Sequence, residues 1–578
     1  MRALRIERRV AVASGQTWPD AIHPVLRRIY AARGVQSPEE VEHRLARLIA
    51  PDRLGGMATA CERLDAAIRT HQHILIVGDF DADGATGTAV AIRGLRLLGA
   101  RQVSYQVPNR FTHGYGLSPA LVETILPLRP DLIVTVDNGI AAHAGVAAAK
   151  AHGIDVVVTD HHLPGDSLPP ADAIVNPNVA GDGFPSKALA GVGVVFYVLL
   201  ALRARLRQSG WFEGEHRREP DLSTLLDLVA LGTVADLVPL DYNNRILVEA
   251  GLRRIRAGQA TAGVLALVEA SKRSTATVNA TDLGFALGPR INAAGRLEDM
   301  SLGIECLLTD DPGRARELAD LLTSINAERR ELQAQMVEQG EAMVGRFLGL
   351  HGDAAFPVGV VLHQPEWHVG VVGLVASKLK ERLHRPVIAC APAGDDSDEL
   401  KASGRSIPGF HLRDALAEVD ARFPGLMTRY GGHAMAAGLS LPSARLGEFA
   451  AAFDAVARRL IGPELLDPVL HTDGELHPQD YDIDLARQLR FAGPWGQTFP
   501  EPLFDDEFTV TDWRLMGQTH LRLSLRHARQ AATLDAVMFG GYAGQPPPAR
   551  IRAVFQLGID DWNGRERLRL LVRHIEAA

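Results

Sequence analysis

Cysteines and long apolar runs are scarce in this sequence of 578 residues. Its three cysteines, Cys61, Cys306 and Cys390, lie far apart and form no CxxC pair, which argues against a disulfide framework and against a structural zinc site. The longest apolar stretch, Ala188 to Leu202, is shorter than the roughly 20 residues that span a bilayer, and the N-terminal residues lack the apolar segment of a signal peptide. We therefore expect a soluble protein of a reducing compartment, the cytoplasm.

An excess of positive charge is also missing. The sequence has 61 Lys and Arg residues against 69 Asp and Glu residues, a net charge of −8. A polyanionic partner would therefore have to contact a local basic patch on an acidic protein. The length predicts several modules, each with its own core.

From His73 onward, apolar β-branched runs alternate with helical segments. The runs HILIVG, QVSYQV, DLIVTV and DVVVT are separated by helix-forming stretches, a pattern typical of βαβ units and of a parallel sheet covered on both faces. A long amphipathic helix, a second α/β module and a β-rich module follow. The predicted boundaries are 1–70 for a segment of short helices, 71–310 for the parallel-sheet domain, 311–347 for the connecting helix, 348–462 for the second α/β domain and 463–578 for the β-rich domain.

Three of the apolar runs end in acidic residues. HILIVG leads into Asp79, Asp81 and Asp83, DLIVTV into Asp137, and DVVVT into Asp160-His161-His162. Because the carboxyl ends of parallel strands meet at one crevice, we expect these side chains to converge there. Clustered carboxylates repel one another unless cations neutralise them, and oxygen ligands with imidazole suit Mg²⁺ or Mn²⁺. Two shared ions about 3.5–4 Å apart would have the geometry for displacement at phosphorus.

Each of these residues also has a simpler explanation. A single Asp after a strand is more often a helix cap or a turn residue, and Asp79 alone could serve to orient its neighbours. A further aspartate, Asp236, follows the helical run LVALGTVA. It either completes the ligand set or is a solvated turn residue before Pro239. Three acidic strand ends in register favour the metal site.

The motifs GDFDADGATGTA, VDNGI, TDHH and LGTVADLVPL resemble the ordered motifs of the DHH phosphoesterase superfamily. The resemblance implies that two Mn²⁺ or Mg²⁺ ions share five ligands, with Asp137 bridging. These ligands are Asp81, Asp83, Asp137, His161 and Asp236. It also implies that three catalytic residues support the ions or handle protons, namely Asp79, Asp160 and His162.

Further motifs, including PNRFTHGYGL, NPN, FALGPRINAAGRLEDM and SGRSIPGF, are similar to those of bacterial single-strand-specific exonucleases of this superfamily. The resemblance implies a hydrolase that degrades single-stranded DNA in the 5′ to 3′ direction to mononucleotides, in DNA repair and recombination. A RecQ-type helicase and a single-strand-binding protein are the implied partners. The implied fold is α/β, with a DHH parallel-sheet lobe and a DHH-associated lobe joined by a long helix, and then an OB-type β-barrel. The loop GPWGQTFPEP departs from the usual glycine-asparagine form of the family.

Seven residues are candidates for contacts with substrate phosphates. They are Ser403, Arg405 and His433 in the second α/β module, Arg110 in PNR, and Arg290, Asn292 and Arg296 in GPRINAAGR. Arginine offers a planar fork to phosphate oxygens, and neighbouring glycines let backbone N–H groups approach. Alternatively, SGRS is a surface turn and the arginines form ordinary ion pairs between lobes.

Leucine and arginine alternate in two C-terminal segments, Leu521 to Arg526 and Arg565 to Arg573. Such strands bury leucine and expose arginine, which suits a barrel that binds a single strand by charge and base stacking. Four aromatic residues are available for stacking, although each is more commonly a core or rim residue: Trp495, Trp513, Tyr542 and Trp562. Acidic neighbours dilute the charge, so a plain solvated face is the alternative.

Two other functions compete with the exonuclease. A small-substrate phosphodiesterase of the same superfamily, acting on oligoribonucleotides, cyclic dinucleotides or pyrophosphate, would need only the two α/β lobes. A non-catalytic partner of DNA-processing machinery would typically lack metal ligands, whereas every predicted ligand is present here. The sequence therefore favours the exonuclease.

Overall fold

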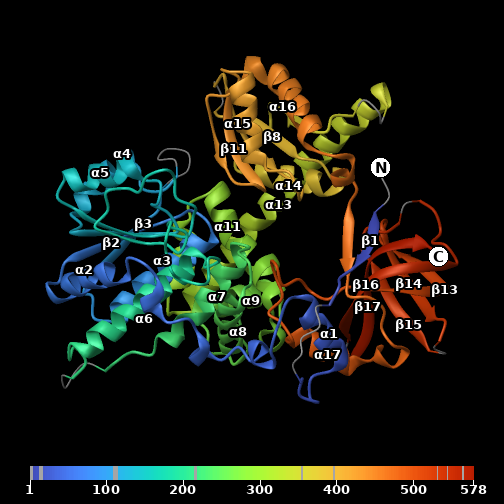
Figure 1. Ribbon diagram of the computed structural model, residues 1–578, viewed down its shortest axis with the longest axis horizontal. Helices are drawn as coiled ribbons and strands as arrows, with labels where there is room; N and C mark the ends of the chain where they lie inside the picture. Colours follow the sequence, from blue (N-terminus) through green and yellow to red (C-terminus); the bar gives the residue numbers. More distant parts are fainter. Residues whose placement is uncertain are drawn as a thin grey trace. The chain divides into compact units, whose positions relative to one another are not determined.

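The computed structural model describes residues 4–11, 17–108, 115–213, 218–352, 356–394, 397–529, 532–542, 544–562 and 565–578. The chain forms two compact units (Figure 1). The larger unit contains Arg8–Thr323 and Thr472–Ala578, and the smaller contains Met1–Glu7 and Ser324–His471. Within the described ranges, no helix combines the length and the apolar character needed to cross a membrane.

A five-stranded sheet forms the first half of the larger unit. Its strands are β2 (His73–Gly78), β3 (Gln102–Gln106), β4 (Leu132–Val136), β5 (Asp155–Thr159) and β6 (Ala173–Val175). All neighbours are parallel, in the order β3-β2-β4-β5-β6. The order reverses beside β2, and ligands of open α/β sheets bind at the carboxyl ends of strands next to such a reversal.

Helices cover both faces of this sheet, which is why its strands are apolar throughout. Ile74 and Ile76 pack with α2 (Met57–Arg69), α3 (Ala82–Leu97) and α6 (Gly191–Gln208). Leu75 and Val77 face the other way and pack with α4 (Pro119–Ile125) and α5 (His143–Ala151). The prediction of a parallel sheet covered on both faces is confirmed.

A helical subdomain follows the parallel sheet in this unit. It contains α7 (Leu226–Ala235), α8 (Tyr242–Arg256), α9 (Ala262–Ala270), α10 (Ala280–Asp282), a π-helical turn at Leu283–Leu287, α11 (Gly288–Leu297) and α12 (Ser301–Leu308). Helix α7 packs against α3 and α8. The apolar run that precedes Asp236 is therefore held beside the helix that follows β2.

The C-terminal part of the larger unit is a closed β-barrel, as predicted. After β12 (Val469–Thr472) and α17 (Ile483–Phe491), its strands are β13 (Phe504–Met516), β14 (His520–His527), β15 (Thr533–Met538), β16 (Arg550–Trp562) and β17 (Arg565–Ala577). They close in the order β13-β14-β15-β17-β16. Leu521, Leu523 and Leu525 of β14 are buried, whereas Arg526 is exposed, so the leucine–arginine alternation has the expected meaning.

The smaller unit has a mixed sheet. Its strands are β7 (Val360–His363), β8 (Val387–Pro392), β9 (Glu399–Arg405), β10 (Arg429–Gly432) and β11 (Ala436–Pro442), in the order β10-β11-β9-β8-β7. Helices α14 (Val372–Leu383), α15 (Leu412–Arg422) and α16 (Leu446–Leu460) accompany it. The chain enters this unit through the long helix α13 (Pro312–His351), in the place where the sequence predicted a connecting helix.

The N-terminal segment is only partly helical. Helices α1 (Pro24–Ala32) and α2 are present, but Arg5–Arg8 form strand β1, which pairs with β12. The expectation of short helices was wrong for these four residues. Strand β1 is too short to show a period, and its partner is remote in the sequence, so local pattern carries no signal for it.

Candidate metal centre and substrate-binding residues

The loop after β2 presents three aspartates, and the local backbone fixes each of them differently. Asp81 caps α3, its Oδ1 accepting the N–H of Gly84 at 3.0 Å. Asp79 Oδ1 accepts the N–H of Phe80 at 2.7 Å. Asp83 is buried in the first turn of α3. Three carboxylates of one short motif therefore have set orientations before any ligand binds.

Asp83 also connects this loop to α6. Its two oxygens accept the N–H groups of Gly191 and Val192, at 2.6 and 2.9 Å. These groups lie in the first turn of α6, where backbone donors have no partner within the helix. A Cβ on residue 191 would lie 2.5 Å from the Cβ of Asp137. Only glycine therefore lets α6 approach both aspartates this closely.

Asp137 follows β4 in an unusual backbone conformation. Its φ is +62°, in the left-handed region that non-glycine residues seldom adopt. Its N–H donates to the carbonyl of Thr159 at 3.1 Å, beside the end of β5. Strain of this kind, at a buried carboxylate, is typical of a functional position.

The Asp-His-His segment after β5 is held by its own first residue. Asp160 Oδ1 accepts the N–H groups of His161 and His162 and lies 2.7 Å from Nδ1 of His162. Its Oδ2 accepts the N–H of Ile140. The side-chain amides of Asn176 and Asn178 donate to the carbonyls of His162 and His161. The NPN motif thus fixes the backbone that carries the two imidazoles.

His161 lies close to aspartates from three other elements. Its Nε2 lies 3.0 Å from Oδ1 of Asp137, 3.5 Å from Oδ2 of Asp236 and 3.9 Å from Oδ2 of Asp83. Asp236 is the residue that ends α7, so the ring of contacts joins β4, β5, α3 and α7. The convergence predicted for the strand ends is present, and Asp236 is part of it.

Burial and mutual repulsion make these carboxylates hard to ionise without a cation. Burial, and then the charge of Asp81, raises the pKa of Asp83 to about 7. Burial, and then Asp83 and Asp81, raises the pKa of Asp137 and of Asp236 well above the ordinary value. The pair of His162 and Asp160 behaves in the opposite way. Burial alone would lower the pKa of His162 and raise that of Asp160, but the hydrogen bond between them has the larger effect. The pKa of His162 is therefore raised to about 9, and the pKa of Asp160 is lowered.

The donor set fits divalent cations. Three overlapping groups have ligand atoms within 4.8 Å of one another, and Asp137 belongs to two of them. The groups are Asp137 with His161 and His162, Asp83 with His161 and Asp236, and Asp79 with Asp81 and Asp137. Oxygen and imidazole donors suit Mn²⁺ and Mg²⁺. The structure adds Asp79 and His162 to the residues that could serve as ligands, beyond the five implied by the family motifs.

Helix α11 contacts the aspartate loop that follows β2. Asn292 Oδ1 accepts the N–H of Ala82 at 2.8 Å, so Asn292 supports the aspartate loop. A Cβ on Gly295 would lie 2.0 Å from the carbonyl oxygen of Phe80, so this glycine permits the contact. Arg290 instead donates to Thr323 Oγ1 and to the carbonyl of Ala286, and Arg296 is half-buried at the end of α11.

In the smaller unit, Ser403 and Arg405 lie on β9 and His433 follows β10. Arg405 Nη1 donates to the carbonyl of Gly404. A Cβ on Gly373, in the first turn of α14, would lie 2.9 Å from Arg405 Nη2 and 3.5 Å from Ser403 Cβ. Burial lowers the pKa of Arg405. A half-buried guanidinium at a helix N-terminus is an arrangement suited to an anion.

Arg110 lies outside the described residues. Tyr115 belongs to the same motif, PNRFTHGYGL, and the sequence singled it out only as part of that motif. It lies beside Asp137 and His162 of the candidate metal centre. The Tyr115 hydroxyl donates to the carbonyl of Asp137 at 3.1 Å and lies 3.5 Å from Nε2 of His162, and its ring packs edge-on against Phe80. The motif marked the segment, but only tertiary structure reveals this contact.

The barrel aromatics differ from one another. Trp495 is buried, with Nε1 donating to the carbonyl of Leu489, so it is a core residue. Trp513 and Tyr542 stack on each other, with ring centroids 6.2 Å apart. The side chain of Trp562 is not among those described. Of these aromatic residues, Trp513 and Tyr542 therefore have partly exposed rings.

Comparison with known proteins identifies all three parts of the chain. The family model for the DHH family, N-terminal domain, matches residues 73–233. The DHHA1 domain matches residues 355–459, and the RecJ OB domain matches residues 472–574.

Whole-length relatives carry the same name. The single-stranded-DNA-specific exonuclease RecJ of Dickeya dadantii is 50% identical over 561 residues, 96% of each chain. That of Escherichia coli is 48% identical over 560 residues, with the same coverage.

Among solved structures, RecJ of Thermus thermophilus in complex with Mn²⁺ has a TM-score of 0.80 at 31% identity, covering 99% of this chain and 80% of that one. The Mg²⁺ complex has a TM-score of 0.74 at 29% identity, with 99% and 79% covered. The chain belongs to the RecJ family of single-stranded-DNA-specific exonucleases, within the DHH phosphoesterases.

Proposed function

We propose that this protein hydrolyses single-stranded DNA from its 5′ end and releases mononucleotides, with two Mn²⁺ or Mg²⁺ ions held by five residues. These are Asp81, Asp83, Asp137, His161 and Asp236. The supporting observation is the convergence of these side chains around His161 and Asp137, in a member of the RecJ family. When bound, the cations stabilise the negative charge that develops on the phosphoryl oxygens.

Asp160 and His162 act on protons in this proposal. Asp160 lies 2.7 Å from Nδ1 of His162, which places the Nδ1 proton toward the carboxylate. Although burial lowers it, the hydrogen bond with Asp160 raises the pKa of His162 to about 9 in the metal-free protein. His162 then donates a proton to the leaving 3′ oxygen as water adds to phosphorus. Asp79 supports the aspartate loop through the N–H of Phe80.

Ser403 and Arg405 bind the terminal 5′-phosphate in this proposal, together with His433. A terminal phosphate carries about two negative charges near neutral pH, one more than an internal phosphate. The half-buried guanidinium of Arg405, beside the first turn of α14, provides the charge that distinguishes a terminal from an internal phosphate. In this proposal, Arg290, Asn292 and Arg296 bind the DNA strand near the aspartate loop. Asn292 also keeps α11 against that loop, because its Oδ1 accepts the N–H of Ala82.

The closed barrel favours a strand over a small substrate. A phosphodiesterase of small molecules needs no barrel, whereas a RecJ OB domain covers residues 472–574 here. We also propose a cytoplasmic role in repair and recombination, in which a RecQ-type helicase or a single-strand-binding protein supplies the strand.

End-labelled single-stranded DNA, duplex DNA, short RNA and pyrophosphate, each tested with Mn²⁺, separate the candidate functions. We expect mononucleotides from the 5′ end of single-stranded DNA. Cleavage of RNA or pyrophosphate in place of single-stranded DNA would refute the proposal.

The change Arg405→Ala tests the phosphate site. A charge-assisted contact contributes about 1.5–3 kcal/mol, so cleavage of 5′-phosphorylated strands should fall roughly ten- to a hundredfold, with loss of the preference over 5′-hydroxyl ends. Arg422→Ala is the control, because Arg422 is exposed and pairs with Glu418 in the same domain. An unchanged preference ratio in Arg405→Ala would place the phosphate site elsewhere.

A further inference from the structure

A cavity of about 520 Å³ lies inside the larger unit, between the catalytic domain and the barrel domain. The catalytic side contributes the residues after α7 and the π-helical turn, and the barrel side contributes the loop 495–501 and β17. Its volume is in the range of small-molecule sites, about 300–1,000 Å³, so it can hold a nucleotide-sized group. None of the residues assigned above as a metal ligand lines it.

One wall of this cavity is apolar and exposed. Phe285 is 79% exposed and Leu237 is 65% exposed, an unusual degree for large apolar side chains in contact with a cavity. The backbone of Phe285 is part of the π-helical turn Leu283–Leu287. Pro289 lacks an N–H and its ring would clash with the carbonyl four residues earlier, at Phe285, so the helix widens there. The sequence thus presents this aromatic ring to solvent by a defined backbone irregularity.

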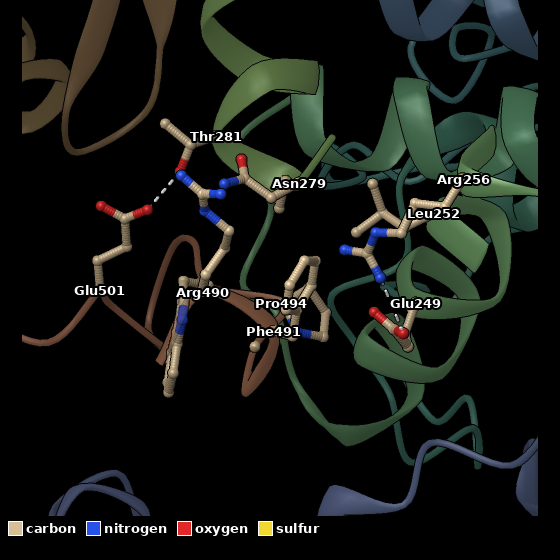
Figure 2. A pocket seen from close by; sticks show the side chains of 12 residues that line it. Glu249, Leu252, Arg256, Asn279, Thr281, Arg490, Phe491, Pro494 and Glu501 are labelled. Carbon is tan, nitrogen blue, oxygen red and sulfur yellow. Dashed lines mark hydrogen bonds and ion pairs between the residues drawn. The ribbon is translucent and has the colours of Figure 1, made fainter. Parts of the chain in front are cut away.

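The opposite wall carries a positioned cation. Arg573 of β17 is exposed and donates to Oε1 of Gln556 at 2.8 Å. Gln556 Nε2 donates to Glu501. Glu501 also accepts the hydroxyl of Thr281 at 2.6 Å, a contact drawn in Figure 2, which shows the neighbouring pocket lined by Arg490. The two oxygens of Glu501 are therefore both occupied. Arg573 is held by a neutral amide, and its charge is available to a phosphate.

The cavity adjoins the metal centre along the chain. Val234 and Leu237, which line it, are separated only by Ala235 and Asp236. A strand that extends from the aspartate cluster toward the barrel has this cavity beside it. Because the enzyme releases mononucleotides, any further nucleotide bound on the barrel side belongs to the strand that remains after the cut.

We propose that this cavity binds one nucleotide of single-stranded DNA on the 3′ side of the scissile bond, beyond the nucleotide that adjoins this bond, with its base against Phe285 and a phosphate at Arg573. This inference rests on the proposed exonuclease function. Every base has a face that can stack on an aromatic ring, so the site accepts any sequence. Arginine provides the planar donor fork that phosphate needs.

Phe285→Ala and Phe285→Trp test the site, with a long oligonucleotide and a 5′-phosphorylated dinucleotide as the two substrates. Stacking of one base contributes about 1–3 kcal/mol, so Phe285→Ala should bind the long strand roughly five- to a hundredfold more weakly. Cleavage of the dinucleotide should be unchanged, and Phe285→Trp should retain binding. Phe423→Ala is the control, because Phe423 is an exposed phenylalanine at the end of α15, outside this cavity.

A second measurement locates the base. 2-Aminopurine is placed at successive positions of a strand bound in EDTA, and its fluorescence should be quenched at one position in the wild type and in Phe285→Trp, but not in Phe285→Ala. The same quenching in Phe285→Ala, or equal losses on the dinucleotide and on the long strand, would overturn the inference. A wild-type protein that neither binds nor cleaves single-stranded DNA would instead refute the proposed exonuclease function.

Discussion

At the scale of single residues, Asp137 combines two features that lower the stability of the fold and are suited to binding cations. Its left-handed backbone costs about 1–3 kcal/mol, and its buried carboxylate faces other carboxylates. Neither feature helps the chain to fold. Both are explained if the residue is fitted to cations that bind after folding.

We expect Asp137→Asn to abolish cleavage while leaving the fold intact. Asparagine tolerates a positive φ better than alanine does, and it removes one of the repelling charges. Activity should fall at least about a hundredfold, because ligands of one cluster act as a unit. Thermal unfolding should be unchanged or shifted upward, and titration calorimetry should show weaker Mn²⁺ binding. Asp166→Ala, an exposed aspartate after the Asp-His-His segment, is the control. Near-normal turnover by folded Asp137→Asn would remove the two-metal account.

The same carboxylates predict how metal-free protein responds to pH. The pKa of Asp83 is raised from 3.8 to about 7, mainly by burial, and those of Asp137 and Asp236 are also raised. The folded state therefore binds more protons than the unfolded state, and the free energy of unfolding falls as pH rises from 3.8 through about 7. His162 acts in the same direction: its contribution is complete below 6.5 and is lost as pH rises through about 9.

Divalent cations replace those protons. The rise in melting temperature caused by Mn²⁺ should therefore be larger at about pH 8 than at about pH 5. Scanning calorimetry on EDTA-treated and Mn²⁺-loaded samples measures both rises. Equal rises at the two pH values would mean that these carboxylates do not hold the ions.

The acidic cluster could be predicted from the sequence because strand ends of a parallel sheet converge by geometry. The supporting residues could not. Gly191 and Asn178 act through contacts between distant segments, and nothing in the local pattern of either position specifies its partner. The NPN motif marked the segment of Asn178 without giving its role, and none of the quoted family motifs covers Gly191.

At the scale of elements, the N-terminal segment is a brace between the barrel domain and the catalytic domain, where the N–H of Ile49 donates to Oδ1 of Asn243 at 3.2 Å. Arg33, after α1, pairs with Asp473 before the barrel, and both side chains are only 1% exposed. The Arg33 guanidinium also lies over the ring of Trp495, which stacks on Phe499. Removal of all residues after about 470 would therefore expose this core, so truncation is a poor test of strand binding.

Arg33→Met should lower the stability of the larger unit strongly. Breaking a buried ion pair by removing one partner costs about 3–5 kcal/mol, because the other charge stays buried. The midpoint of urea unfolding should fall, and Arg33→Met/Asp473→Leu should lose less than the sum of the single changes. Arg207→Ala is the control, because Arg207 and its partner Glu219 are solvent-exposed and such pairs contribute about 0–1 kcal/mol. A loss from Arg33→Met no larger than that of the control would rule out the brace.

At the scale of the whole molecule, a chain of net charge −8 has to bind a polyanion through selected arginines. Many barrel arginines are neutralised: Arg522 and Arg569 pair with Asp535, and Arg552 pairs with Asp505. Within the described ranges, Arg514, Arg526 and Arg567 are exposed and no carboxylate pairs with them. The alternation of leucine and arginine predicted the exposed side of each strand, but the cross-strand carboxylates that cancel some charges follow from strand register, which the alternation does not specify.

The difference between paired and unpaired barrel arginines sets the salt dependence of DNA binding. Each arginine that neutralises a phosphate of single-stranded DNA contributes about 0.7 to the slope of log affinity against log salt concentration. Replacing Arg514, Arg526 and Arg567 together by glutamine should therefore make the slope shallower by about 0.7 for every phosphate that is no longer neutralised. Arg522→Gln is the matched control, because the charge of Arg522 is already paired with Asp535, and it should leave the slope nearly unchanged. Fluorescence anisotropy of a labelled oligonucleotide in EDTA, over a range of KCl concentrations, gives both slopes without cleavage. If the triple variant retained the wild-type slope, the phosphates would be held elsewhere, and the barrel would not be the surface that captures the strand.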